Sequence, residues 1–270
     1  MKHNLCSTGA LIGRLNGRDW RLLEKFAPRL KFDGYEFMVY DSWYERLSEV
    51  VRDVARLGLN IPTLHCEKTL GELLAVREYA EAERQFKLNC RAAADLGARL
   101  LVLHLWNGRI SDSHIDNNIE GCKRLEPIAD SFGLRLTVEN VVCNCRDPMC
   151  HIDRLAAETD VCFTFDTKMA AFHRQLDDVF APERACLWHD RRIRHIHIND
   201  YAGGYMDWQN LRTLHPGQGN IDFARFFSSL KDMSYSGDYT IEATSFDQSG
   251  EVDLDALNRD YEYVRDCLAR

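Results

Sequence analysis

Short apolar runs alternate with longer stretches of helical period along the whole chain. The apolar runs lie at 5–9, 34–39, 61–66, 100–105, 134–140, 161–166, 193–199 and 239–243. Between them, segments such as 43–57, 72–96 and 223–230 carry Leu, Ala, Glu, Lys and Arg at spacings of three and four, which is typical of amphipathic helices. Gly58, Gly97 and Gly133 stand where such helices would end in a left-handed residue. The pattern predicts alternating strands and helices.

Eight such repeats are the count of a (β/α)8 barrel. An open, doubly wound sheet is the rival fold, and its first loop normally carries a Gly-rich phosphate turn. The corresponding loop here, STGALIGRLNGRD at 7–19, lacks the G-x-G-x-x-G pattern. No Pro-, Gly- or Ser-rich linker interrupts the chain. We therefore predict an α/β protein, with residues 1–270 forming a single TIM barrel domain.

Composition narrows the class of protein further. The 270 residues are 45% apolar, enough to bury one large core, and carry a net charge of -8, which disfavours nucleic acid as a partner. No apolar run approaches the roughly 18 residues of a membrane span, and the N-terminal segment lacks the apolar stretch of a signal peptide. We expect a cytoplasmic protein whose ten cysteines remain thiols, with neither a nucleic acid nor a membrane as partner.

Ionisable side chains recur where the predicted strands end, which is where the active site of such a barrel lies. They are Glu36, His65, His104, Glu139, Asp166, His197 and Glu242. Threonines stand two residues before four of these positions, on the same strand faces: Thr63, Thr137, Thr164 and Thr240. Unpaired charge is costly inside a barrel, so the pattern predicts one polar cluster at the barrel mouth.

A divalent cation would gather two Glu, an Asp and a His at one point. A set of three carboxylates and one imidazole leaves positions open for water or substrate. It suits an open site for Mn²⁺, Mg²⁺, Co²⁺ or Zn²⁺ better than it suits a structural zinc site, whose ligands are mostly thiolates. Such an ion can hold adjacent sugar oxygens and polarise a carbonyl. Carboxylates on opposite sides of the substrate could then remove and return a proton beside that carbonyl.

Five motifs carry a resemblance to a known superfamily. They are VEN at 138–140, FDTKMA at 165–170, HIND at 197–200, HPGQGNIDF at 215–223 and IEATSF at 241–246. In order and spacing they resemble the xylose-isomerase-like barrels, which include sugar phosphate isomerases and epimerases, ketose 3-epimerases, inosose dehydratases and, more distantly, the endonuclease IV family. The resemblance implies a metal held by Glu139, Asp166, His197 and Glu242. In the ketose 3-epimerase branch, the residues that match Glu139 and Glu242 are also the catalytic acid–base pair.

The chain departs from the family at Met169, where many relatives place a histidine. A thioether neither carries a proton nor binds a hard cation well. His65 and His104 match positions that bind additional zinc ions in the endonuclease IV branch. Without a histidine at 169 and without a basic surface, we expect both to line a sugar pocket, with structural hydrogen bonding and metal binding as the alternatives.

Further contacts to the substrate are expected from residues at or just beyond strand ends. Lys68 and Lys168 could pair with a substrate phosphate or with the carboxylates of the site itself. Trp106 could pack on the C–H face of a sugar or serve as lid packing. The predicted substrate-binding residues are Glu36, His65, Lys68, His104, Trp106 and Lys168.

One cysteine motif stands apart from this site. Cys143, Cys145, Cys150 and His151 form C-x-C-x4-C-H in the loop after Glu139. The ligand types suit zinc, but the spacing is not that of a usual zinc knuckle. We favour free thiols in a lid, with a zinc clip as the alternative.

Four functions remain open. The leading one is a metal-dependent isomerase or epimerase acting on a sugar or sugar phosphate. The second is a lyase of the inosose-dehydratase kind. The remaining two are an endonuclease-IV-like nuclease and a barrel that binds a ligand without turnover. The substrate is expected to be a small-molecule sugar; assembly as a homodimer or a homotetramer is left open.

Overall fold

The strands of the computed structural model form a closed parallel barrel in the order β1-β2-β3-β4-β5-β6-β7-β8, which confirms the predicted fold class. The structure describes residues 3–107, 111–247 and 249–269. The strands are β1 Asn4–Ser7, β2 Gly34–Met38, β3 Thr63–His65, β4 Leu100–Leu103, β5 Arg135–Glu139, β6 Cys162–Asp166, β7 Ile193–Ile198 and β8 Asp238–Ile241. Each overlaps one predicted apolar run.

Two compact units make up the chain, and each is described by itself. The first is Met1–Glu36 with Asp166–Arg270, and the second is Phe37–Phe165. Helices of the first unit are α1 Leu22–Phe26, α7 Thr167–Phe172, α8 Ala185–His189, α9 Phe223–Asp232 and α10 Leu254–Ala269. Helices of the second unit are α2 Leu47–Ala55, α3 Leu70–Ala75, α4 Tyr79–Leu96, α5 Ile115–Ser131 and α6 Pro148–Glu158. Within the described part of the chain, no helix is long and apolar enough to cross a bilayer.

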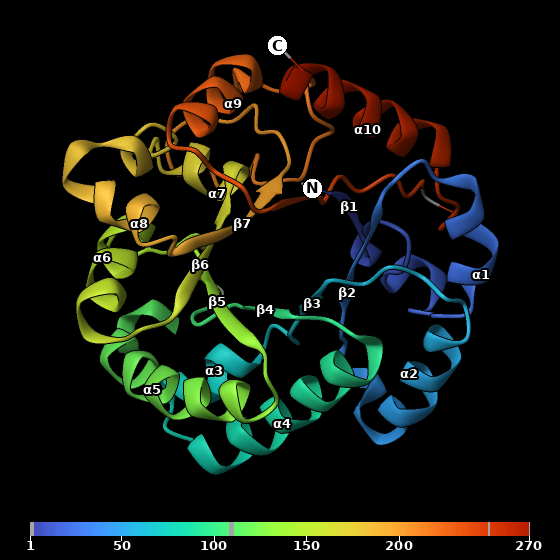
Figure 1. Ribbon diagram of the computed structural model, residues 1–270, viewed down its shortest axis with the longest axis horizontal. Coiled ribbons are helices and arrows are strands. Elements are labelled where there is room, and N and C mark those ends of the chain that lie inside the picture. Colours follow the sequence, from blue (N-terminus) through green and yellow to red (C-terminus); the bar gives the residue numbers. More distant parts are fainter. Residues whose placement is uncertain (1–2, 108–110, 248, 270) are drawn as a thin grey trace. The chain divides into compact units, whose positions relative to one another are not determined.

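In the second unit, α3, α4 and α5 pack on one another (Figure 1). The segment of helical period over 72–96 forms two helices, because the chain breaks between α3 and α4, where Arg77 adopts φ +64°. Gly71 explains how closely α3 approaches the barrel, since a Cβ there would lie 2.6 Å from the carbonyl oxygen of His104. The left-handed glycines are as predicted, with φ +65° at Gly58 and +78° at Gly97.

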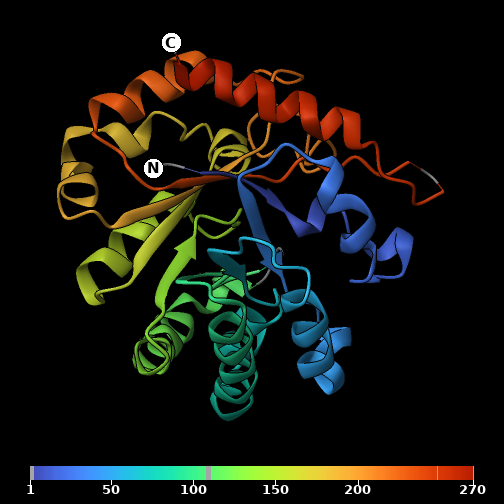
Figure 2. The ribbon, with the colours of Figure 1, turned by 45° about the vertical axis from the view of Figure 1, so that its right-hand side comes forward.

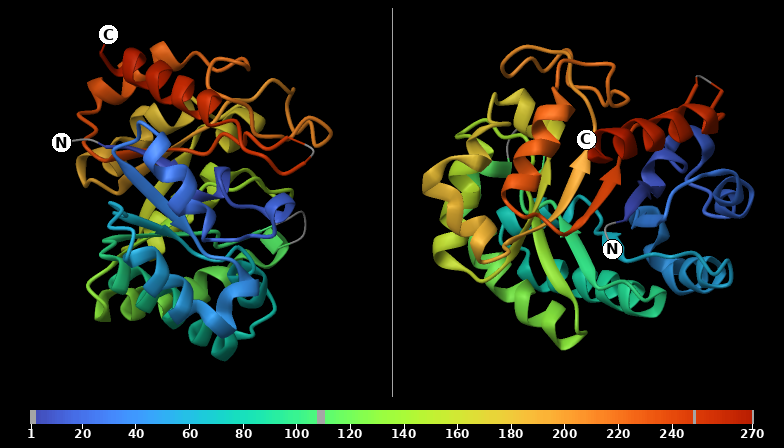
Figure 3. Two further views of the ribbon diagram at one scale, coloured as in Figure 1. Left: turned by 90° about the vertical axis from the view of Figure 1, so that its right-hand side faces the viewer. Right: turned by 45° about the horizontal axis from the view of Figure 1, so that its top comes forward.

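In the first unit, β7 and β8 lie side by side as parallel arrows (Figure 3), with His197 opposite Thr240. Helices α9 and α10 pack against each other (Figure 2). On α9, the buried residues include Phe223, Phe226 and Phe227, so its apolar face supplies core on the outside of the strands. Strand side chains that alternate with this core face the barrel interior, and they carry the polar groups described below.

A buried carboxylate organises the long loop that follows β7. Asp200 is fully buried and accepts four backbone N–H groups, from Tyr201 at 2.8 Å, Gly217 at 2.9 Å, Gly219 at 2.9 Å and Ile221 at 3.1 Å. Four donors offset the cost of burying its charge. This carboxylate therefore holds the HPGQGNIDF segment against the end of β7.

Replacing Gly219 tests this arrangement. A Cβ at that position would lie 2.3 Å from Asp200 Oδ1 and 2.6 Å from the backbone oxygen of Tyr201, so Gly219→Ala should lower the free energy of unfolding by about 1–3 kcal/mol. Gly204→Ala is the matched control in the same loop, because a Cβ there meets nothing within 4 Å. Urea denaturation of both variants measures the difference, and equal stabilities would contradict the role given to Asp200.

Candidate metal centre and active site

Glu36 lies between two histidines in the first unit. Its Oε2 is 3.0 Å from His195 Nε2 and 3.1 Å from His197 Nε2, and the hydroxyl of Thr240 donates to the same oxygen at 3.2 Å. All four side chains are buried. Burial alone would raise the pKa of the Glu36 carboxyl, but His197 and His195 together hold it well below its usual range. Glu36 is therefore a buried anion that orients imidazoles.

His195 was missed by the sequence analysis. It stands two residues before His197 on β7, so the two rings share one strand face. Its Nε2 also lies 2.8 Å from Thr240 Oγ1. The two-residue spacing that places Thr63, Thr137 and Thr164 beneath charged strand ends also places His195 beneath His197, and this signal could have identified His195 from the sequence.

Asp166, His197 and Glu242 come together at the ends of β6, β7 and β8. Each offers one ligand atom, and these atoms lie within 4.8 Å of one another. Asn199 holds the two carboxylates, since its Nδ2 donates to Asp166 Oδ2 at 2.9 Å and to Glu242 Oε2 at 3.3 Å. His197 Nδ1 lies 3.6 Å from Glu242 Oε2, while its Nε2 faces Glu36. An imidazole whose far nitrogen donates to a carboxylate is the usual arrangement of a metal-ligating histidine.

Asp166 is also tied to the helix that follows it. Its Oδ1 accepts the backbone N–H of Met169 at 2.6 Å and so caps α7. The backbone N–H of Met169 thereby orients Asp166. Lys168 is nearly buried, and its Nζ donates to Thr213 Oγ1 at 2.9 Å.

The second unit contains the same motif of one carboxylate and two imidazoles. Glu139 Oε2 lies 2.9 Å from His104 Nε2 and 3.4 Å from His65 Nε2, and all three side chains are buried. Burial lowers the pKa of His104 to about 4 against the opposing effect of Glu139, so His104 is neutral at pH 7 and donates its Nε2–H. Beneath them, the hydroxyls of Thr137 and Thr164 are 2.7 Å apart.

His65 is held in one orientation by the backbone. Its Nδ1 lies 2.8 Å from the carbonyl oxygen of Cys66, which can only accept, so Nδ1 carries the proton. Its Nε2 lies 3.4 Å from Glu139 Oε2, so His65 and His104 face the same carboxylate oxygen.

The remaining predicted contacts differ in exposure. Lys68 is exposed. Trp106 is fully buried; its Nε1 donates to the carbonyl of Val141 at 2.8 Å, and its ring packs edge-on against His151 with centroids 5.0 Å apart. In these contacts Trp106 packs the loop after β5.

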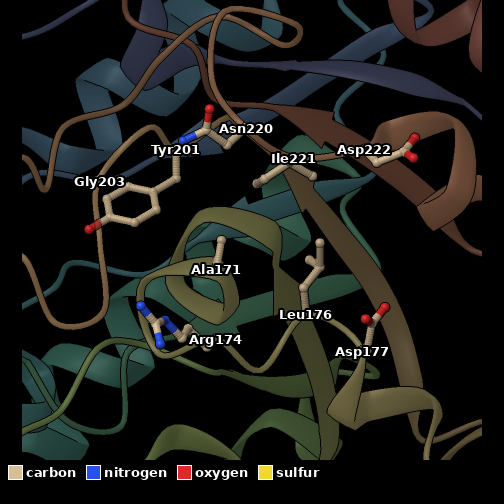
Figure 4. Close-up of a pocket in the computed structure, with 9 residues that line it drawn as sticks. All are labelled: Ala171, Arg174, Leu176, Asp177, Tyr201, Gly203, Asn220, Ile221 and Asp222. Carbon is tan, nitrogen blue, oxygen red and sulfur yellow. The ribbon is translucent and has the colours of Figure 1, made fainter.

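A pocket of about 240 Å³ opens in the first unit beside α7 (Figure 4). Its lining side chains are Ala171, Arg174, Leu176, Asp177, Tyr201, Asn220, Ile221 and Asp222, with the backbone of Gly203. None is a predicted site residue. Tyr201 instead donates its hydroxyl to the carbonyl of Gly204 at 2.7 Å, so it shapes the loop after β7.

Comparison with known proteins defines the family. Residues 25–267 match the family model described as xylose isomerase-like TIM barrel, and the chain belongs to this family. An inosose dehydratase of Salmonella typhimurium is 24% identical over 246 residues, 81% of this chain and 75% of that protein. An inosose dehydratase of Erwinia tasmaniensis is 26% identical over 197 residues, 66% of this chain, and the match spans 64% of the length of that protein.

Solved structures share the fold over nearly the whole chain. The 3-keto-D-glucoside 4-epimerase YcjR of E. coli has a TM-score of 0.68 at 18% identity, covering 99% of this chain and 100% of that one. The IOLI protein with a bound zinc atom has a TM-score of 0.71 at 18% identity, covering 100% and 98%. D-allulose 3-epimerase from Methylomonas sp. has a TM-score of 0.70 at 15% identity, covering 98% and 96%.

The contact between Glu36 and His197 leads to a prediction about metal affinity. Glu36→Gln removes the charge that orients the His197 ring, and loss of such a partner typically weakens metal binding by about 10–100-fold. Titration calorimetry with Mn²⁺ on chelator-treated protein measures the effect, with Glu24→Gln, an exposed residue of α1, as the control. Equal affinity of Glu36→Gln and wild type would show that Glu36 does not support a metal ligand.

Proposed function

We propose that this protein is a metal-dependent isomerase or epimerase acting on a sugar or sugar derivative by proton transfer next to a carbonyl. The observation that carries the proposal is the convergence of Asp166, His197 and Glu242, with Asn199 between the carboxylates. The names of several structurally similar proteins, among them a keto-glucoside epimerase and an allulose epimerase, support the choice of substrate class.

The donor set fits a divalent cation. Asp166 and Glu242 both accept from the amide of Asn199, and His197 Nδ1 lies 3.6 Å from Glu242 Oε2. Two negative charges and an imidazole nitrogen therefore converge on one point, where a cation would offset the charge. Oxygen donors with one imidazole suit Mn²⁺, Mg²⁺ or Co²⁺, and Zn²⁺ also accepts them. When bound, such an ion would polarise a substrate carbonyl.

We propose Glu139 as the fourth ligand. What supports this is the pairing of β5 with β6, in which Glu139 lies opposite Thr164. Asp166 follows two residues later on the same strand face, at the end of β6. Consecutive strand ends of a parallel sheet meet at one edge, where barrel active sites lie.

Glu139 and Glu242 are the proposed proton-transfer pair. Inversion at one carbon needs a proton acceptor on one face and a donor on the other, and strands five and eight lie apart around an eight-stranded barrel. Glu242 is the more open of the two, with 16% of its side chain exposed against 1% for Glu139. His104, kept neutral by burial, donates to Glu139 and holds its carboxylate in place.

A dehydratase is the second candidate, because curated relatives of this chain include inosose dehydratases. The same carboxylates could remove a proton beside a carbonyl while a neighbouring hydroxyl departs as water. The two reactions share their first step and differ in the fate of that hydroxyl.

Incubation with Mn²⁺ in D2O separates these functions. Across a panel of ketoses, ketose phosphates, keto-glycosides and inososes, we expect one substrate to gain deuterium at the carbon beside its carbonyl and to yield an epimer or isomer of unchanged mass apart from the label. Mass spectrometry and NMR follow the products. Loss of water from an inosose would replace the isomerase proposal with the dehydratase, and inertness of the whole panel would count against both.

Glutamine substitutions test the acid–base pair. Glu139→Gln and Glu242→Gln retain size but remove the titrating group, so kcat should fall by about 10²–10⁴-fold with the metal still bound. Asp166→Asn should act through metal loss and recover partly in excess Mn²⁺. Steady-state kinetics alongside metal analysis distinguishes the two effects. If Glu139→Gln at full metal occupancy turns over at the wild-type rate, the two-carboxylate mechanism is wrong.

A further inference from the structure

A second group of potential ligands lies in the loops of the second unit, apart from the strand-end residues. Asp112, Cys143 and His151 each offer one ligand atom within 4.8 Å of the others, and all three are buried. Asp112 precedes α5, Cys143 follows β5 and His151 lies in the first turns of α6. Segments distant in sequence thus bring an oxygen, a sulfur and a nitrogen donor to one point.

His151 supplies an independent observation. Its side chain is 1% exposed, and neither ring nitrogen has a hydrogen-bond partner among the described residues. A buried imidazole with both nitrogens unsatisfied is costly. Its nearest charged neighbour is Asp112, with Nε2 and Oδ2 3.6 Å apart, which is beyond a hydrogen bond.

That separation is the one expected of two ligands on a common ion. A tetrahedral zinc with bonds of about 2.0–2.2 Å has neighbouring ligand atoms about 3.3–3.6 Å apart. Asp112 is already aimed, because Oδ2 accepts the backbone N–H of Cys145 at 2.8 Å and Oδ1 accepts that of Asn144 at 3.2 Å. The Trp106 ring packs edge-on against that of His151, and all three candidate ligands are buried away from water.

We propose that Asp112, Cys143 and His151 bind a zinc ion that fastens the residues directly before α5 to the β5–α6 loop. A thiolate, an imidazole and a carboxylate together select zinc over Mg²⁺ or Ca²⁺, and three protein ligands leave one position for water. Binding displaces the proton of Cys143 to solvent and ends its contact with the carbonyl of Arg146, now 2.7 Å from Sγ. This site is distinct from the strand-end centre, whose ligands contain no sulfur.

Cobalt substitution distinguishes the two centres by this difference. Chelator-treated protein loaded with Co²⁺ should show a thiolate-to-cobalt charge-transfer band in the near ultraviolet, which oxygen and nitrogen ligands do not produce. Cys143→Ser should lose the band together with one equivalent of bound zinc by elemental analysis. Cys186→Ser, which alters an exposed cysteine outside the cluster, is the matched control and should retain both.

His151→Gln provides a second variant, and circular dichroism checks the fold of each. The His151→Gln variant should also lose one equivalent of zinc. Its thiolate-to-cobalt band should be weaker or shifted, although the Cys143 thiol is intact. Absence of the band from cobalt-saturated wild type, or its persistence in Cys143→Ser, would overturn the proposal. Mn²⁺ binding at the oxygen-rich centre is measured separately on the same samples, so failure of one site is not mistaken for failure of the other.

Discussion

A carboxylate buried inside a barrel must be matched by donors from neighbouring strands, because an unpaired charge there costs far more than any single packing contact returns. Both units meet this constraint in the same way. In the first, Oε2 of Glu36 lies against the Nε2 atoms of His195 and His197; in the second, Oε2 of Glu139 accepts from His104 Nε2 and lies 3.4 Å from His65 Nε2. These contacts orient the carboxylates at the strand ends, while the carbonyl of Cys66 holds the His65 ring.

The end of β7 serves the site and the adjoining loop at once because successive side chains of a strand point to opposite faces. Asn199 bridges Asp166 and Glu242, and the next residue, Asp200, gathers the backbone of 217–221. Thr167, the first residue of α7, donates to the carbonyl of Asn199 at 2.7 Å and so ties α7 to the same strand end. The residue that bridges the two carboxylates is therefore the direct chain neighbour of the residue that orders the loop after β7.

The local sequence pattern was enough to predict the fold, and the positions of the strand ends followed from that prediction. Apolar runs and glycine caps depend on neighbours within a few positions, so the strands and the left-handed ends at Gly58 and Gly97 could be predicted. Partnerships between distant segments could not: Glu36 and His197 are 161 positions apart, and no local pattern names one as the partner of the other. Asp112 likewise lies outside the C-x-C-x4-C-H motif and joins Cys143 and His151 only in space, so the motif by itself could not identify Asp112 as their neighbour.

The loop after β5 connects the two sites proposed in the second unit. Glu139 ends the strand, and four residues later Cys143 enters the buried cluster with His151. Trp106 contacts both parts of this loop, since its Nε1 donates to the carbonyl of Val141 and its ring packs against His151. A ligand that fixes Cys143 would therefore restrict the backbone that immediately follows Glu139, and rigid support of this kind is what a proton-transfer group requires, because its rate falls steeply when the carboxylate departs from productive geometry.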